Sequence, residues 1–190
     1  MKNLVWLVDT SLDGFISSPD GGLDWAARDI DTEYWSDVNE LLRTVDTTLF
    51  GRATYQNFEQ YWPAVTASPA GHLKDEIEFS RWIEATPKFV ASKTLSELPW
   101  KNSHLLKGNL NAAIAELKAQ SRANVLIFGS STLSAQLLEG NLIGLVHLRI
   151  HPVVLGAGRP LVPDLAPPLK LKLLDSKSFH SGVVRLRYQL

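Results

Sequence analysis

The sequence predicts an α/β fold: a twisted, mixed but mainly parallel β-sheet, flanked by helices and completed by antiparallel strands at the C-terminus. Short apolar, β-prone runs alternate with segments of helical periodicity through most of the chain, which is typical of a parallel sheet. The last segment instead alternates apolar and polar residues, as an antiparallel strand does. A length of 190 residues without an internal repeat or linker predicts a single domain over residues 1–190.

Four apolar runs are the expected strands of the parallel part of the sheet. Each is apolar on both faces, so each belongs in a sheet that is covered on both sides. These runs are residues 3–9, 47–50, 88–91 and 125–128.

Three segments have the periodicity of amphipathic helices. In residues 31–45, apolar residues recur at intervals of three and four, and Asp31 is placed to accept hydrogen bonds from the first free amides. The recurring residues are Trp35, Val38, Leu42 and Val45. Two more helices are expected over residues 75–85, ended by Pro87, and over residues 109–120.

Two stretches near the C-terminus read as further strands. Residues 142–156 form a long β-prone run that ends at Gly156. Residues 182–190 alternate Val184, Leu186 and Tyr188 with polar neighbours, which is typical of an antiparallel edge strand or hairpin.

Charge and composition exclude several classes of protein. The 19 basic and 20 acidic residues leave a net charge of −1 without a long run of either sign, so we expect neither a nucleic-acid nor a membrane partner. The apolar run at the N-terminus meets Asp9, far short of the roughly 20 residues that a membrane helix needs. The absence of cysteine excludes disulfides, thiolate zinc sites and a cysteine nucleophile, and it fits a cytoplasmic protein.

The histidines show no spacing typical of a metal site, and we expect no metal. His147 and His151 stand four apart, but in a β-prone run this spacing separates them by about 13 Å. The remaining histidines are His72, His104 and His180. The segment "FGSSTL" also lacks the GxSxG pattern of a hydrolase nucleophile.

A strand-to-helix turn in "VLIFGSSTLSAQLL" is the first candidate for a ligand site. Gly129 lets the backbone approach a ligand closely, and the amides of the following helix start favour an anion such as phosphate. Ser130, Ser131 and Thr132 add hydroxyl donors. The alternative is a simple turn with a Ser or Thr cap.

Two other strand ends carry similar groups. Gly51, Arg52 and Thr54 follow one strand, and an arginine there can pair with a phosphate through its planar fork. Another strand is followed by Ser92, Lys93 and Thr94, which suit a phosphate monoester. Each has an ordinary alternative, an exposed arginine or a solvated loop, but a ligand with several phosphates would explain all three strand ends.

Five segments together resemble one protein family. They are "SLDGFISSPDGGLDW", "LFGRATYQNF", "KFVASKTL", "VLIFGSSTLSAQLL" and "HPVVLGAGRPL", in family order over nearly the whole chain. The chain resembles the dihydrofolate reductase-like superfamily, and within it a stand-alone form of the reductase domain of bacterial riboflavin biosynthesis proteins. The resemblance implies a dihydrofolate reductase-like fold with an NADPH-binding cleft.

The resemblance also implies roles for individual residues of this cleft. Residues matching Gly51, Arg52 and Thr54 approach the cofactor phosphates, and those matching Ser92, Lys93 and Thr94 lie near the 2′-phosphate. The turn made of Gly129, Ser130, Ser131, Thr132 and Leu133 would seat the pyrophosphate. Ile16 and Ser17 would lie beside the nicotinamide, and Trp25 would meet the substrate.

The activity implied is NADPH-dependent hydride transfer to a small heterocycle, a pterin, pyrimidine or flavin precursor, at a C=O or C=N group. Asp13, in the "SLDG" segment, is the first candidate for the proton donor, ahead of Asp24, Asp29 and Asp31. Carboxylates in a polar loop are ordinarily solvated, or they form turns or helix caps. The glycines Gly14, Gly21 and Gly22 could let the loop that carries Asp13 open and close.

Three features depart from relatives of this family. The acidic residue that follows a Trp-x-Leu-Pro segment in dihydrofolate reductases is missing from "LDWAARDID", which argues against folate reduction. Gly144 and Leu145 replace an acidic pair found in many relatives. No deaminase zinc motif precedes the domain in this sequence, so we do not expect the two-domain riboflavin enzyme.

Two other classes of function stay open. One is a sensor that binds NADPH without catalysis. The other is an interaction module in which the apolar stretch "LVHLRIHPVVL" forms a dimer contact. We expect a homodimer and a small-molecule substrate, and dimerisation is compatible with catalysis.

Overall fold

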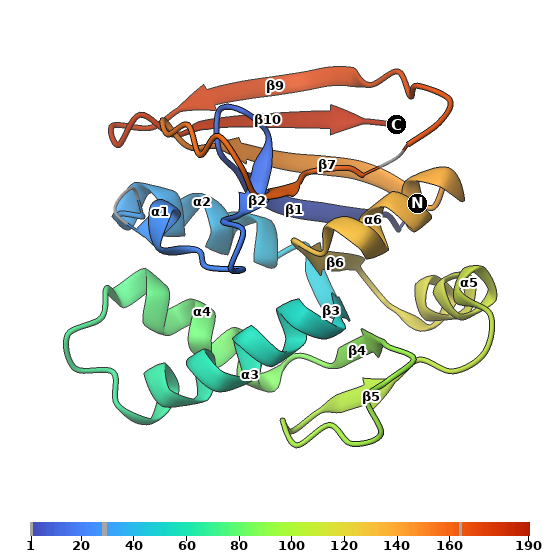
Figure 1. Cartoon of the computed structure of the whole chain (residues 1–190). Helices are drawn as coiled ribbons and strands as arrows, with labels where there is room; N and C mark the ends of the chain where they lie inside the picture. The colour runs from blue at the N-terminus through green and yellow to red at the C-terminus, as the bar shows by residue number, and fades with distance from the viewer. Residues whose placement is uncertain (1, 28–29, 164) are drawn as a thin grey trace.

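The computed structural model describes residues 2–27, 30–163 and 165–190, and its main element is an eight-stranded sheet of order β5-β4-β3-β6-β1-β7-β10-β9 (Figure 1). The strands are β1 Leu4–Thr10, β2 Phe15–Ser17, β3 Val45–Gly51, β4 Lys88–Ala91, β5 Ser103–Leu105, β6 Asn124–Phe128, β7 Ile143–Ile150, β8 Arg159–Pro160, β9 Lys172–Ser178 and β10 Val184–Gln189. The helices are α1 Asp24–Ala27, α2 Thr32–Leu42, α3 Arg52–Ala67, α4 Lys74–Ala85, α5 Leu110–Gln120 and α6 Ser131–Glu139.

The sheet is parallel from β5 to β7 and antiparallel beyond it. Each neighbouring pair among β5, β4, β3, β6, β1 and β7 is parallel, whereas β10 pairs antiparallel with both β7 and β9. This confirms the predicted α/β fold with antiparallel strands at the C-terminus. The short strands β2 and β8 form a separate two-stranded sheet.

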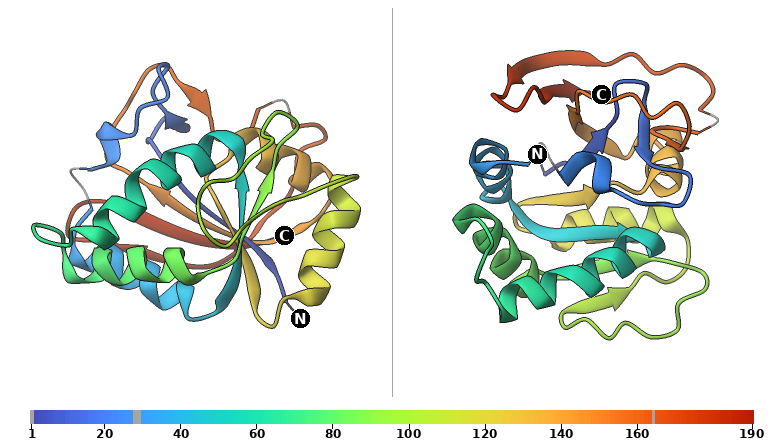
Figure 2. Two further views of the ribbon diagram at one scale, coloured as in Figure 1. Left: turned by 90° about the horizontal axis from the view of Figure 1, so that it is seen from below. Right: turned by 60° about the vertical axis from the view of Figure 1, so that its left-hand side comes forward.

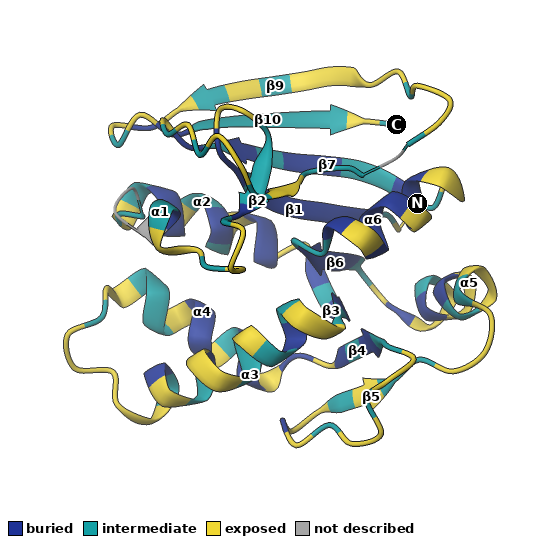
Figure 3. Ribbon diagram, in the orientation of Figure 1, coloured by how far each residue is buried: buried dark blue, intermediate teal, exposed yellow. Residues whose placement is uncertain are grey.

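Helices cover both faces of the sheet, and each face has its own core (Figure 2). In β1, Val5 and Leu7 belong to the core that includes residues of α2, α3 and α4. Leu4, Trp6 and Val8 point to the opposite face and belong to the core that includes residues of α5 and α6. The central strands are therefore buried along most of their length (Figure 3), as their unbroken apolar runs predict.

The three expected helices are present as α2, α4 and α5, with one difference at the end of α2. Asp31 caps α2 as predicted, because its carboxylate accepts a hydrogen bond from the Tyr34 amide at 2.8 Å. Val45, however, starts β3 rather than ending the helix. The β-branched residues of the run "VDTT" favour the strand there.

The pairing of β7 at residues 143–150 limits how one expected contact could form, and the contact stays a prediction. The stretch "LVHLRIHPVVL" was a candidate for a dimer contact, but β7 is hydrogen bonded to β1 on one side and to β10 on the other. It therefore offers no free edge, and its residues Val146, His147 and Arg149 are buried. The edge strand on this side is β9, which the sequence analysis did not identify because it is polar over Asp175–Ser178. The homodimer itself stays a prediction.

A buried lysine lies at the amino end of β4. The Lys88 side chain is fully buried and donates hydrogen bonds to the carbonyl oxygens of Thr86 at 2.9 Å and Glu84 at 3.4 Å. Its ammonium group also lies 4.4 Å from the centre of the Trp100 ring. Burial lowers the pKa of Lys88 to about 8, even though the nearby Glu84 carboxylate acts in the opposite direction.

This pKa predicts a pH-dependent stability. Between pH 8 and the ordinary lysine pKa of about 10.5, the unfolded chain holds a proton on residue 88 that the folded chain releases, so the free energy of unfolding rises with pH. Comparing the protein with Lys88→Met by urea unfolding from pH 7 to pH 10 should show a gain of up to about 3 kcal/mol in the parent relative to the variant. Parallel pH profiles for the two proteins would contradict the shifted pKa.

Candidate functional site

The strand ends that carry the candidate residues meet at one edge of the sheet. The parallel strands β4, β3, β6, β1 and β7 are consecutive neighbours, so their carboxyl ends lie side by side. In the register, Gly51 at the end of β3 pairs with Ala91 at the end of β4. The three groups of polar residues found in the sequence therefore belong to one region.

Two of these strand-to-helix turns touch each other. The Gly51 amide donates a hydrogen bond to Ser130 Oγ at 3.0 Å, and Thr54 Oγ1 lies 2.9 Å from the same oxygen. A Cβ atom on residue 51 would lie only 2.8 Å from Ser130 Oγ, so the contact requires glycine at this position. We call residues 51–54 and 129–133 the paired turns.

The second of the paired turns has an uncommon backbone that is held by several hydrogen bonds. Gly129 and Ser130 both have positive φ angles, +50° and +59°. For serine this conformation costs roughly 1–2 kcal/mol. The Gly129 carbonyl oxygen accepts hydrogen bonds from Trp6 Nε1 at 2.7 Å and Ser134 Oγ at 3.2 Å, and its amide donates to the Leu7 carbonyl at 3.0 Å. These bonds fix the turn against β1.

The paired turns bring two helix N-termini together. The helix α3 has 16 residues and α6 has nine, and no side chain of the described residues caps the start of either helix. Ser131 Oγ, at the start of α6, is also buried without a hydrogen-bond partner among the described residues. Free amides, aligned helix dipoles and an unused hydroxyl suit an anion, so these residues fit the diphosphate of a dinucleotide.

The third group of polar residues, Ser92, Lys93 and Thr94 after β4, lies beside the paired turns but does not start a helix. Ser92 Oγ accepts hydrogen bonds from the amides of Thr94 at 3.2 Å and Leu95 at 3.0 Å, which makes a local turn. Lys93 and Thr94 are exposed, as is Arg52, whose guanidinium lies 3.3 Å from Gln56 Oε1. The cations at positions 52 and 93 are therefore accessible to a ligand.

The loop after β1 is bound to the segment after β7. Ile16 and Ser17 lie in β2, which pairs with β8, and the Leu12 amide donates to the Val153 carbonyl at 2.8 Å. Ser17 is buried and Ile16 packs against the core. The Gly158 backbone passes so close that a Cβ there would lie 2.1 Å from the Ser17 carbonyl oxygen.

Asp13 strengthens this connection, and its geometry does not support the expected role as proton donor. Its carboxylate accepts hydrogen bonds from the amides of Leu155 at 3.0 Å and Gly156 at 2.7 Å. Hydrogen bonds from Ser11 and from these two amides lower the pKa of Asp13 to about 2. The carboxyl group is then ionised at neutral pH and holds no proton to donate.

The other carboxylates considered for that role are no better placed. Asp24 is exposed on α1 and Asp31 caps α2. Asp29 lies outside the described residues.

A charged cluster that the sequence analysis missed lies at the carboxyl ends of β1 and β7. Asp9 Oδ2 accepts a hydrogen bond from Arg149 Nη2 at 2.9 Å, and Asp9 Oδ1 accepts one from Tyr34 Oη and one from His151 Nε2, both at 2.9 Å. The Arg149 guanidinium also stacks 4.1 Å from the centre of the Tyr34 ring. We call Asp9, Tyr34, Arg149 and His151 the Asp9 cluster.

The cluster keeps Asp9 ionised. Burial opposes ionisation, but the charge of Arg149 and the hydrogen bonds from His151 and Tyr34 outweigh it and lower the pKa of Asp9 to about 2. An ionised carboxylate only accepts hydrogen bonds, so His151 carries a proton on Nε2 in this contact.

A sequence signal for the cluster existed. Asp9 ends an apolar strand, and Arg149 and His151 interrupt another β-prone run, whereas charged residues are rare in the middle of a covered sheet. His147, which the sequence analysis compared with His151, faces a different environment. Burial and the nearby Arg187 and Arg185 charges lower its pKa to about 4.

Trp25, the expected substrate residue, packs against this cluster. Its ring meets the His151 ring edge-on, with centres 5.3 Å apart. Its Nε1 atom is buried and has no hydrogen-bond partner in the described part of the chain.

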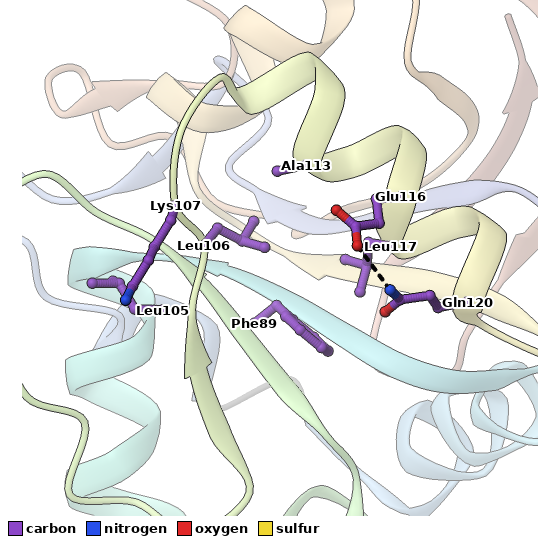
Figure 4. Close-up of a pocket in the computed structure, with 8 residues that line it drawn as sticks. All are labelled: Phe89, Leu105, Leu106, Lys107, Ala113, Glu116, Leu117 and Gln120. Atoms are coloured by element: carbon purple, nitrogen blue, oxygen red, sulfur yellow. Dashed lines mark hydrogen bonds between the residues drawn. The ribbon is translucent and has the colours of Figure 1, made fainter.

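A separate pocket of about 270 Å³ lies between α5 and the strands β4 and β5 (Figure 4). It is lined by Phe89, Leu105, Leu106, Lys107, Ala113, Glu116, Leu117 and Gln120. None of these residues is a predicted site residue, and none belongs to the paired turns or the Asp9 cluster.

Residues 2–27, 30–163 and 165–190 contain neither a candidate metal site nor a candidate membrane-spanning helix. No group of three or more histidine or acidic side chains is arranged to hold a metal ion. No helix there is both long and apolar enough to cross a membrane.

Comparison with known proteins identifies relatives over the whole chain. The model of the RibD C-terminal domain family matches residues 2–185. The protein YyaP of Bacillus subtilis (strain 168) is 30% identical over 187 residues, which cover 98% of this chain and 94% of YyaP.

Solved structures resemble the fold. A putative riboflavin biosynthesis protein from Shewanella sp. PV-4 superposes with a TM-score of 0.72 at 25% identity, over 98% of both chains. A diaminohydroxyphosphoribosylaminopyrimidine deaminase/5-amino-6-(5-phosphoribosylamino)uracil reductase from Thermotoga maritima superposes with a TM-score of 0.66 at 16% identity, over 99% of this chain and 56% of that one.

The contact between the paired turns leads to a test of stability. Gly51→Ala forces a methyl group against Ser130 Oγ, 2.8 Å away, and should lower the free energy of unfolding by about 1–3 kcal/mol. The backbone is not the cause, because residue 51 has a φ of −80°, which alanine adopts readily.

The matched control is the same substitution in a Ser130→Ala background, which removes the clashing oxygen. Chemical unfolding of the four proteins should show a smaller cost of Gly51→Ala in that background. An equal cost in both backgrounds would show that the Ser130 hydroxyl is not the source of the clash.

Proposed function

The chain belongs to the RibD C-terminal domain family, and from that premise we propose that it is an NADPH-dependent reductase that transfers a hydride to a small pyrimidine-like heterocycle. Family membership indicates an oxidoreductase of the pyrimidine-reductase type. The choice of NADPH, the kind of substrate and the residues that bind them are the proposal.

The paired turns are the observation that carries the choice of a dinucleotide. The Gly51–Ser130 hydrogen bond of 3.0 Å joins the starts of α3 and α6, so two helix dipoles act on one small volume. A diphosphate accepts hydrogen bonds from both helix starts and from Ser131 Oγ, which is buried without a partner among the described residues.

The proposed binding residues follow the sequence prediction. Gly51, Thr54 and residues 129–133 would hold the phosphates that join the two nucleosides, and Arg52 would pair with the 2′-phosphate. Ser92, Lys93 and Thr94 would bind the 2′-phosphate, and Ile16 and Ser17 would contact the nicotinamide. NADPH, when bound, supplies the hydride.

The substrate would lie against Trp25 and the Asp9 cluster. The Asp9 cluster lies at the carboxyl ends of β1 and β7. The strand β1 is the neighbour of β6, which leads into the second of the paired turns. Binding against these side chains would exclude water from the reacting C=O or C=N group of the heterocycle. Because Asp13 is held ionised, we assign it a structural role and not the role of acid.

Titration with NADPH and NADH tests the cofactor, followed by nicotinamide fluorescence and by the melting temperature, which a ligand of the native state must raise. The Thermotoga enzyme is described as acting on 5-amino-6-(5-phosphoribosylamino)uracil, so this compound and its dephosphorylated form are the first substrates to assay for NADPH oxidation. A sensor would bind NADPH without turnover, and an interaction module would do neither.

The 2′-phosphate assignment predicts a difference between the two cofactors. Arg52→Ala and Lys93→Ala each remove an exposed cation and should weaken NADPH binding by about tenfold, with less than about a twofold effect on NADH. Arg81→Ala, which removes an exposed arginine of α4, is the matched control and should change neither affinity. Equal losses for NADPH and NADH would contradict the assignment of these cations to the 2′-phosphate.

A further inference from the structure

Asp9 is the member of its cluster that a ligand can reach. Its side chain is 29% exposed, whereas those of Arg149 and His151 are 4% and 0% exposed. Tyr34 is also buried. Three buried side chains thus hold one partly exposed carboxylate at the end of β1.

The carboxylate can accept one more hydrogen bond. A carboxylate offers about four acceptor positions, two on each oxygen. Among the described residues, Oδ1 accepts from Tyr34 and His151, and Oδ2 accepts from Arg149. One position on Oδ2 is left for a donor from outside.

Trp25 supplies the complementary group. Its buried Nε1–H has no acceptor among the described residues, and a buried polar group without a partner costs about 1–3 kcal/mol. Trp25 and Asp9 both contact the imidazole of His151, one through its ring edge at 5.3 Å between centres and the other through a hydrogen bond of 2.9 Å. The donor Trp25 Nε1 and the acceptor Asp9 therefore belong to two side chains that both contact the buried His151.

The pair also lies close to the paired turns. The Leu7 carbonyl accepts the hydrogen bond of the Gly129 amide, at 3.0 Å. Asp9 is two residues further along β1, which corresponds to about 7 Å.

Building on the proposed function, we propose that Asp9 and Trp25 recognise the lactam edge of the substrate ring, with Trp25 Nε1 donating to a ring carbonyl oxygen and Asp9 accepting from the adjacent ring N–H. Uracil-like and pterin-like rings carry this N–H/C=O edge, and rings alkylated on nitrogen lack its donor. The remaining residues of the cluster act on Asp9: Arg149, His151 and Tyr34 fix the direction of its carboxylate.

The test uses two probes and needs no turnover. Binding of 6-aminouracil and of 6-amino-1,3-dimethyluracil to the whole protein is measured by ligand-observed NMR. The parent protein should bind 6-aminouracil at least about tenfold more tightly, because methylation removes the donor to Asp9. Asp9→Asn should weaken 6-aminouracil by about tenfold and remove the preference between the probes. Trp25→Phe should weaken both probes by about tenfold, because both keep the ring carbonyl oxygens.

The control variants separate recognition from folding. Asp31→Asn changes a nearby carboxylate but keeps a side chain that caps α2, so it should leave both probe affinities unchanged. Trp25→Phe keeps an aromatic ring against His151, and it tests the inference even if Asp9→Asn, which leaves Arg149 without its carboxylate, fails to fold.

NADPH titration of the same proteins separates this inference from the proposed function. The inference is supported by unchanged NADPH affinity in the variants, together with a lost preference for 6-aminouracil in Asp9→Asn and weaker binding of both probes in Trp25→Phe. A parent protein that binds NADPH but does not prefer 6-aminouracil overturns it, as does an Asp9→Asn variant that keeps the preference or a Trp25→Phe variant that binds both probes as tightly as the parent. A parent protein that does not bind NADPH overturns the proposed function instead.

Discussion

The pairing of β1 with β6 on one side and β7 on the other is the constraint on which the candidate site depends. Through β6, β1 holds the paired turns, because Trp6 and Leu7 hydrogen bond to Gly129. Through β7, it aligns Asp9 with Arg149, and the His151 amide donates to the Thr10 carbonyl at 2.8 Å. A shift of one residue in either register would turn these side chains to the other face of the sheet. One strand therefore fixes both halves of the site relative to each other.

The Asp9 cluster is costly to bury, and this cost bears on its role. Taking a carboxylate and a guanidinium out of water costs several kcal/mol per ion, and a well-packed apolar pair would serve stability as well or better. Two nitrogen atoms of Arg149, Nε and Nη1, are buried without a partner among the described residues, so its hydrogen bonding is incomplete. Stability alone gives no reason for such an arrangement at the carboxyl edge of the sheet, whereas the binding of a polar ring does.

The sequence predicts most elements of the fold and only part of the site. Periodicity and a cap residue are local signals, so α2 with its Asp31 cap could be predicted before the structure was known. The three polar strand ends could also be found, but not the contact of Gly51 with Ser130, since the two residues are 79 positions apart. The Asp9 cluster depends on pairing across 140 positions between Asp9 and Arg149, which no local pattern contains. Asp13 was chosen from its segment, and only the structure shows that two backbone amides occupy its carboxylate.

The arrangement of the loop after β1 limits how the site can open. Residues 11–17 are bonded to the segment after β7 through Leu12, Asp13 and the β2–β8 pair, so the anchored part of the loop cannot swing away without breaking all of these bonds together. Gly14 lies inside this anchored part, which leaves Gly21 and Gly22 as the glycines of the loop outside it. Trp25 follows them on α1. The Asp9 carboxylate is held by three buried side chains, whereas the Trp25 indole has an edge-on ring contact with His151. Under the proposed function, a movement that admits a substrate would therefore displace Trp25 and leave Asp9 in place.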